Sequence, residues 1–325
     1  MYFRIEWAVK GIDLPKGHDQ NYQKTDQPAI NLQLYQPAEG REPNLAKGDW
    51  LGVVETEEAV SDRLRTKFAA PGTATPGVAA VFTRVFVLTH DFLSRVCGIL
   101  RWRRGASNPT PTIVLHRVSW SDDNQKWSIV RHSGHLSIDF GIPIIQDLST
   151  DLVDSIRQIV RDGISEPLGH ELFNEAWQLR NSHPRSALMI GISAAEVGVK
   201  MFIGKLAPHA AWLALYAPTP PLHLILTDYL PTLPVLKRIN GRAPVIPKSI
   251  VDDLKYGVNL RNDTAHKGKT IETDTLKRIL LTVRELLYIL DRFSGNEWAD
   301  EHISIENLNA MAADPVEAKR KPKKQ

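Results

Sequence analysis

The chain has 325 residues, of which 42% are hydrophobic and 24% charged, as is typical of a folded globular protein rather than a disordered one. Its single cysteine, Cys97, excludes an internal disulfide and any metal site built on several cysteines. The net charge of +3 comes from the last nine residues, EAKRKPKKQ, without which 35 basic and 36 acidic residues remain. The rest of the chain therefore shows no bulk preference for nucleic acid.

The first residues are not expected to form a signal peptide. MYFRIEWAVKGIDLPKGHDQ alternates apolar and polar residues and lacks the apolar stretch of a signal peptide. No run of about 18 apolar residues is apparent along the chain, which predicts no membrane-spanning helix. We therefore expect a cytoplasmic protein that makes no membrane contact.

Residues 1–145 are predicted to form a mixed α/β domain. Alternating or β-branched patterns predict strands at FRIEWAV (3–9), INLQLYQ (30–36), VAAVFTRVFVL (78–88) and HLSIDF (135–140), and a hairpin around SDDNQ (121–125). A helix is predicted over 89–104, with Thr89 as its N-cap. Its last turn, RWRRG (101–105), is either a snorkelling helix end, with the arginine heads in solvent, or a place where Arg beside Trp stacks a base. No motif assigns this domain a role, and a sensor or regulator is suggested by analogy alone.

Helices dominate the second half of the chain. A linking helix is expected at 146–164, and a four-helix bundle at 165–295. The periodicity predicts the four helices at 167–183, 184–206, 246–266 and 274–293, with a proline-rich insertion at 207–246. Residues 296–325 are expected to be a basic, disordered tail. The fold class is therefore α+β, a β-rich domain followed by an all-α one.

The stretch LRNDTAHKGKT (260–270) ends in Gly-Lys-Thr and resembles the end of a phosphate-binding loop. Such a loop needs a glycine at position 263, which is Asp263, and it follows a strand rather than a helix. Gly268 is better explained as the residue that ends the helix. The sequence therefore does not predict a phosphate-binding loop here.

A polar group remains in this stretch. Helical spacing places Arg261 on the same face as Leu254, Val258 and Ala265, with Asn262 and His266 at the edge of that face. A half-buried arginine requires a partner, and Glu196 is the one carboxylate of the central helix between residues 187 and 204. Either these side chains are a structural ion pair with a capping histidine, or they form a functional site.

Residues 261–266, Arg-Asn-Asp-Thr-Ala-His, resemble the Arg-x4–6-His signature of HEPN domains, with Asn262 as the polar residue that commonly follows the arginine. The position of the motif at the end of a long helix, before another amphipathic helix and after a central helix with a carboxylate, is similar as well. The similarity covers about residues 165–295, and the order of the two halves resembles Apea-like HEPN proteins with an N-terminal extension.

The resemblance implies a metal-independent RNA endonuclease that uses no cofactor and acts as a toxin or in antiphage defence. His266 would be the acid/base, Arg261 the phosphate clamp, Asn262 a group that orients the phosphate or the imidazole, and Glu196 the partner that holds Arg261. Lys267 and Lys269 would bind the RNA substrate. The implied partners are RNA, a second copy of the chain in a homodimer, and an antitoxin or defence-system protein. A non-catalytic module that binds nucleotide or protein, and a helical interaction domain with a structural arginine, remain as alternatives.

Overall fold

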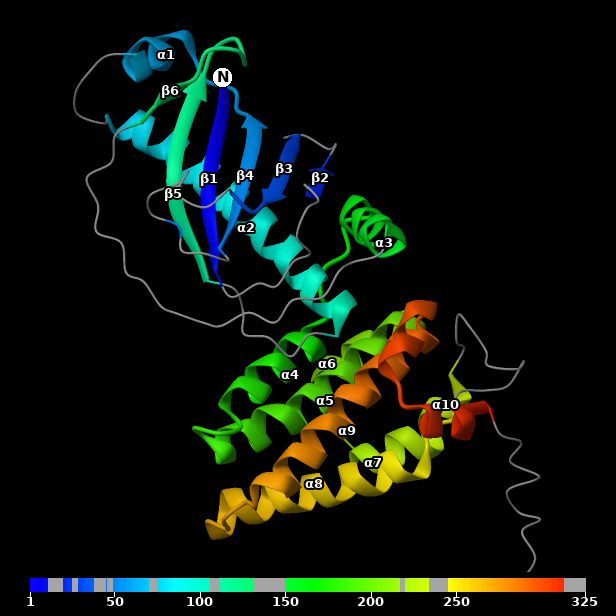
Figure 1. The fold of residues 1–325 in the computed structure, drawn as a ribbon. Coiled ribbons are helices and arrows are strands. Elements are labelled where there is room, and N and C mark those ends of the chain that lie inside the picture. Colours follow the sequence, from blue (N-terminus) through cyan, green and yellow to red (C-terminus); the bar gives the residue numbers. More distant parts are fainter. Residues whose placement is uncertain are drawn as a thin grey trace, which may run out of the picture. The chain divides into compact units, whose positions relative to one another are not determined.

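The computed structural model describes residues 1–10, 20–24, 29–37, 45, 49–69, 75–105, 112–130, 150–216, 220–233 and 245–312. The chain divides into two compact units, Met1–Glu166 and Pro167–Gln325, which are described separately below. The first unit contains a β-sheet with helices and the second unit is helical, which agrees with the α+β class (Figure 1).

The first unit is built on a six-stranded antiparallel sheet with the order β2-β3-β4-β1-β5-β6. Its strands are β1 (Tyr2–Lys10), β2 (Gln20–Lys24), β3 (Ile30–Tyr35), β4 (Trp50–Glu57), β5 (Thr112–Ser121) and β6 (Ser128–Ile129). The predicted strands at 3–9 and 30–36 and the predicted hairpin around 121–125 are confirmed. Every second residue of β1 lies in the core, namely Phe3, Ile5, Trp7 and Val9.

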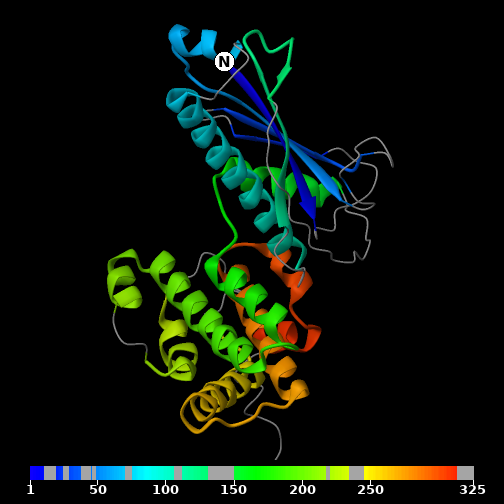
Figure 2. The ribbon, with the colours of Figure 1, turned by 90° about the vertical axis from the view of Figure 1, so that its left-hand side faces the viewer.

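The strand predicted at 78–88 is wrong, because these residues belong to the long helix α2 (Pro76–Arg104). Its buried residues include Val78, Val81, Val85 and Phe92, and this three-to-four-residue spacing matches a helix better than a strand. The helix runs along one face of the sheet (Figure 1 and Figure 2), where the rings of Phe82 and Phe3 lie 6.0 Å apart. Packing on the sheet therefore outweighs the β-propensity of the valines.

Among its described residues the first unit has two further helices, α1 (Asp62–Ala69) and α3 (Thr150–Arg161). Helix α3 lies within the linking helix expected at 146–164, but it is part of this unit rather than a connector. Ile156 and Val160 are buried in the core of the sheet domain, and Arg157 Nε donates to the carbonyl oxygen of Asn21 on β2 at 3.3 Å. The strand predicted at 135–140 lies outside the described residues.

The four helices predicted for the second unit are confirmed as α4 (Leu168–Leu179), α5 (Pro184–Leu206), α8 (Lys248–Lys267) and α9 (Thr273–Phe293). Helix α5 packs against α4, α8 and α9. Glycines make these contacts close: a Cβ on Gly169 of α4 would lie 3.1 Å from the Cα of Gly198 on α5. Because backbones meet at this distance, α4 and α5 form a tightly packed pair.

Two of the described helices, α2 and α5, are long and apolar enough to cross a membrane by length and composition alone. Core helices of folded proteins pass the same test, so the expectation of no membrane-spanning helix stays a prediction. In their units α2 packs on the sheet and α5 packs among the other helices of the second unit.

The proline-rich insertion forms several short helical turns. They are η1 (Pro208–Ala210), α6 (Ala211–Tyr216), α7 (Leu222–Leu224), η2 (Ile225–Tyr229) and η3 (Leu230–Thr232). The expected tail at 296–325 is partly folded, because η4 (Glu297–His302) and α10 (Ile305–Ala312) bury Ala299, Ile303 and Met311. This segment folds because it contains apolar side chains that can be buried. The basic residues 317–325 lie outside the described part of the chain.

Candidate functional site

The candidate site lies on the last two turns of α8. This helix ends at Gly268, whose φ of 66° places it in the left-handed region, as the sequence predicts. The buried face differs from the prediction by one residue, since Thr264 is buried and Ala265 exposed. Gly257 accounts for the difference: its missing side chain lets Ile192 of α5 and Ile279 of α9 approach to 2.9 Å from where a Cβ would stand.

Arg261 is half-buried and is held by two neighbours. Its Nη1 lies 3.3 Å from Glu196 Oε1 on α5, so the predicted ion pair is confirmed. Its Nε donates to Asn262 Oδ1 at 3.2 Å, which makes Asn262 a support of the guanidinium. The side chains of Arg261 and Glu196 are 25% and 23% exposed, so the pair is in contact with solvent. Nη2 of Arg261 makes no hydrogen bond with the residues that the structure describes.

His266 lies one helical turn after Asn262 and is exposed. Within the described part of the chain its imidazole makes no hydrogen bond and no ion pair. Asn262 thus does not orient the imidazole, contrary to one of the two roles expected for it. The structure brings Arg261, Asn262 and Glu196 into contact and leaves His266 on the same helix end, open to a ligand.

Lys267 and Lys269 share one carboxylate, Asp263. Lys267 Nζ lies 2.8 Å and Lys269 Nζ 4.0 Å from the Asp263 carboxylate oxygens. The hydrogen bond and the charge of Lys267 hold the pKa of Asp263 below its usual range, so the carboxylate is ionised at neutral pH. The three side chains together carry one net positive charge, which is less than the two lysines alone would offer to RNA.

Sequence reasoning missed two residues here. Arg185 Nη2, from the first turn of α5, donates to the carbonyl oxygen of Gly268 at 3.2 Å and caps the end of α8. This contact depends on which helix ends meet, and no periodicity in the sequence reveals it. Asp263 could have been found, since Asp and Lys four residues apart on a helix commonly pair.

The helix end RWRRG (101–105) offers no base-stacking surface. Arg101, Trp102 and Arg103 are all buried, and Arg101 forms an ion pair with Glu166. The alternative of a snorkelling helix end is not borne out for Arg101 and Arg103 either, because both side chains are buried rather than extended into solvent. Cys97 is also buried, and burial raises the pKa of its thiol to about 12, which makes it a poor nucleophile.

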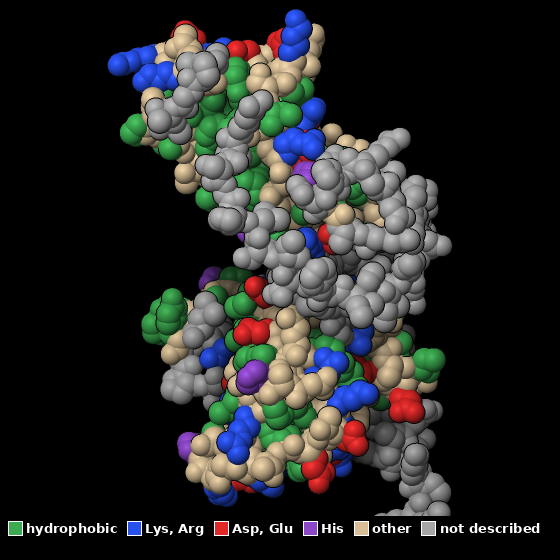
Figure 3. Space-filling view, turned by 60° about the vertical axis from the view of Figure 1, so that its left-hand side comes forward, with side chains coloured by type: hydrophobic (Ala, Val, Ile, Leu, Met, Phe, Trp, Pro, Cys, Tyr) green, Lys and Arg blue, Asp and Glu red, His purple; other side chains and the backbone are tan. Residues whose placement is uncertain are grey.

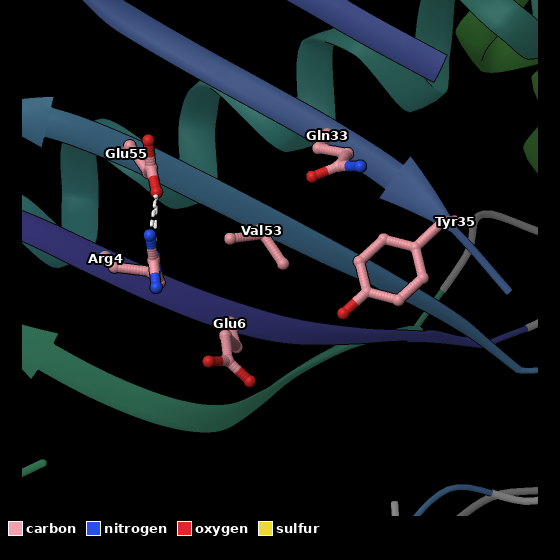
Figure 4. A pocket seen from close by; sticks show the side chains of 6 residues that line it. All are labelled: Arg4, Glu6, Gln33, Tyr35, Val53 and Glu55. Carbon is pink, nitrogen blue, oxygen red and sulfur yellow. Dashed lines mark hydrogen bonds and ion pairs between the residues drawn. The ribbon is translucent and has the colours of Figure 1, made fainter. Parts of the chain in front are cut away.

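The first unit has a polar hollow of about 370 Å³ on the sheet face opposite α2 (Figure 4). Gln33 and Tyr35 of β3 face Arg4 and Glu6 of β1 across Val53, and Glu55 completes the lining. Both carboxylates are paired with arginines, Glu55 with Arg4 at 2.6 Å and Glu6 with Arg117 at 3.3 Å. The hollow therefore offers polar contacts but no carboxylate ready for acid–base chemistry.

The surface charge of the helical unit is mixed. On its face in Figure 3, Lys and Arg side chains lie among Asp and Glu side chains. Among the residues that the structure describes, no three His, Cys, Asp or Glu side chains are grouped as a metal site would require. Comparisons with protein-family models, with curated proteins and with solved structures found no match. The resemblance to HEPN domains thus rests on residues 261–266 and on the order of the four helices, and it stays a prediction.

Proposed function

We propose that this chain is a metal-independent RNA endonuclease of the HEPN type. One observation carries the proposal: Arg261 is fixed by Glu196 and Asn262, keeps Nη2 available, and shares the end of α8 with the exposed His266. A guanidinium carries five N–H donors, so Arg261 can hold Glu196 and Asn262 and still donate to a ligand. Because the Arg261–Glu196 pair is partly exposed, the guanidinium of Arg261 is positioned to bind an anionic ligand, such as the phosphodiester of RNA.

The chemistry that suits these groups is transesterification by the 2′-hydroxyl of RNA. A neutral imidazole takes the proton of the 2′-OH, the 2′ oxygen bonds to phosphorus, and the bond from phosphorus to the 5′ oxygen breaks. The leaving 5′ oxygen takes a proton from an imidazolium. Arg261 would stabilise the charge on the non-bridging oxygens as it grows. The products are a 2′,3′-cyclic phosphate and a 5′-hydroxyl end.

Each copy of the chain supplies one His266, whereas this reaction uses one base and one acid. Two copies related by a two-fold axis would supply both around one phosphate, so the proposed enzyme is a homodimer. In that arrangement each Glu196 offsets the charge of its Arg261, which lowers the repulsion between the two guanidinium groups. Lys267 and Lys269 would add a weaker, salt-sensitive attraction for RNA. A role as a toxin or antiphage effector in the cytoplasm, with an antitoxin or defence-system partner, belongs to this proposal through the resemblance.

The test is RNA cleavage by the purified full-length chain in EDTA, with the chemistry of the product ends determined by mass spectrometry. We expect cleavage that leaves 2′,3′-cyclic phosphate ends, and we expect Arg261→Ala to reduce the rate at least about 100-fold. Glu196→Gln should reduce it less, because Asn262 still contacts the guanidinium. RNA that is bound but stays intact would favour the non-catalytic binding module instead.

A further inference from the structure

Two aromatic side chains are exposed together on α6. Trp212 is 66% and Tyr216 71% exposed, and their ring centroids lie 5.4 Å apart with an angle of 34° between the planes. They are four residues apart and therefore lie on the same side of the helix. Contiguous apolar groups on a protein surface, as distinct from single scattered ones, mark binding sites in many proteins.

Helix α6 lies at the edge of the helical unit (Figure 2). The helix packs on the C-terminal part of α5, where a Cβ on Gly204 would lie 3.6 Å from Ala211 Cβ. Met201, which lies one turn before Lys205 on α5, is 44% exposed.

The chain on either side of the pair is basic in sequence. The sequence contains no Asp or Glu from residue 197 to residue 227, whereas it contains Lys200, Lys205, His209 and His223. Lys205 and His209 are exposed, and both lie within a few residues of the contact between α5 and α6. A negatively charged ligand is thus favoured here over a cationic one.

We propose that Trp212 and Tyr216 form a stacking platform for the bases of single-stranded RNA. The proposal rests on the proposed function and names the class of RNA that the enzyme binds. Every base has a flat π-face that stacks on an aromatic ring, while lysine side chains neutralise the backbone phosphates. Paired bases in a duplex are not available for such stacking, so the platform selects single strands.

The test is binding of a fluorescein-labelled, unstructured 12-nucleotide RNA to the full-length chain, measured by fluorescence anisotropy. The His266→Ala variant is used so that the RNA stays intact. In this background Trp212→Ala and Tyr216→Ala should each raise Kd about tenfold, and Trp212→Phe less than about threefold. The same RNA annealed to its complement should bind more weakly.

Tyr256→Ala is the matched control, because Tyr256 is another exposed tyrosine of this unit, 45% exposed on α8. It should leave Kd unchanged. Circular dichroism of each variant establishes that it is folded, which is expected because the altered rings are exposed. Sedimentation of each variant measures self-association at the same time.

A Kd that neither alanine variant changes, or no binding of the single strand at all, would overturn the platform. So would a loss of self-association without a loss of RNA binding, which would assign the pair to a protein interface. The two proposals fail separately. Cleavage that persists in Trp212→Ala with unchanged KM rejects the platform alone, whereas platform-dependent binding without cleavage by the wild type rejects the nuclease alone.

Discussion

Arg261 and Glu196 show at the scale of single residues how far the sequence predicts contacts. This ion pair could be predicted because Arg261 lies on the apolar face of its helix and α5 has one carboxylate near its middle. The 3.3 Å distance between Arg261 Nη1 and Glu196 Oε1 confirms it. The partner of Arg185, a carbonyl oxygen at the end of another helix, could not be predicted. Backbone acceptors exist at every residue, so their use depends on three-dimensional placement alone.

Asp123 gives a pH-dependent prediction at this scale. Its carboxylate accepts hydrogen bonds from the backbone N–H groups of Lys126 and Gln125 and from the hydroxyl of Ser121, and these bonds lower the pKa of Asp123 to about 2. The ordinary value is about 3.9. Because the folded pKa is the lower one, the contribution of Asp123 to stability is complete above pH ~4 and is lost as the pH falls through about 2.

The measurement is an NMR titration of the Asp123 carboxyl carbon together with the amide signals of Gln125 and Lys126. We expect all three signals to move together with a midpoint near pH 2. A midpoint near the ordinary value of about 3.9 would show that the carboxylate does not cap this turn.

At the scale of elements, the sequence predicts the four long helices well because each has a clear apolar stripe, as in α9, where the predicted core residues Leu276, Leu280 and Val283 are buried. It fails for α2, whose valines suit a strand as well as a helix. It also misplaces the buried face of α8 by one residue. There Gly257 contacts Ile192 of α5 and Ile279 of α9. Glycine is not scored as apolar when a helical pattern is read from the sequence, so this contact is not predicted.

The close contact of α4 and α5 predicts that Gly169→Ala destabilises the protein. The added methyl group would lie 3.1 Å from the Cα of Gly198 and 3.3 Å from the carbonyl oxygen of Ala194, and backbone atoms do not yield as a flexible side chain does. We expect a loss of about 1–3 kcal/mol in the free energy of unfolding, measured by urea denaturation.

Gly204→Ala is the control for this experiment, because its nearest neighbour would be at 3.6 Å, an ordinary contact. It should be neutral or stabilising by up to about 1 kcal/mol, since alanine favours the helix. Equal effects of the two variants would contradict the close packing of the helices.

At the scale of the whole molecule, the sequence anticipates a β-rich part followed by a helical part. It does not anticipate that α3 belongs to the sheet domain or that residues 297–312 fold onto the helical unit. Both depend on contacts between segments far apart in the chain, which local patterns do not contain. The candidate site was found because its residues are close in sequence, and its contact with α5 followed from one distinctive carboxylate.

The proposed homodimer gives a prediction at this scale. When wild type and His266→Ala are mixed in equal amounts and allowed to exchange subunits, about a quarter of the dimers are wild-type homodimers. If each site needs two histidines, RNA cleavage falls to about a quarter of that of the wild type at the same total concentration. A fall to one half, as dilution alone gives, would show that each copy acts by itself.

The most direct measurement for the RNA endonuclease itself is the single-turnover rate of RNA cleavage in EDTA by wild type, His266→Ala and His90→Ala. His90 is an exposed histidine of α2 in the first unit and serves as the control. We expect His266→Ala to lose at least about 100-fold in rate while it keeps the melting temperature of the wild type, because an exposed imidazole buries little area. His90→Ala should cleave at the wild-type rate. Cleavage by folded His266→Ala at the wild-type rate would contradict the assignment of this site.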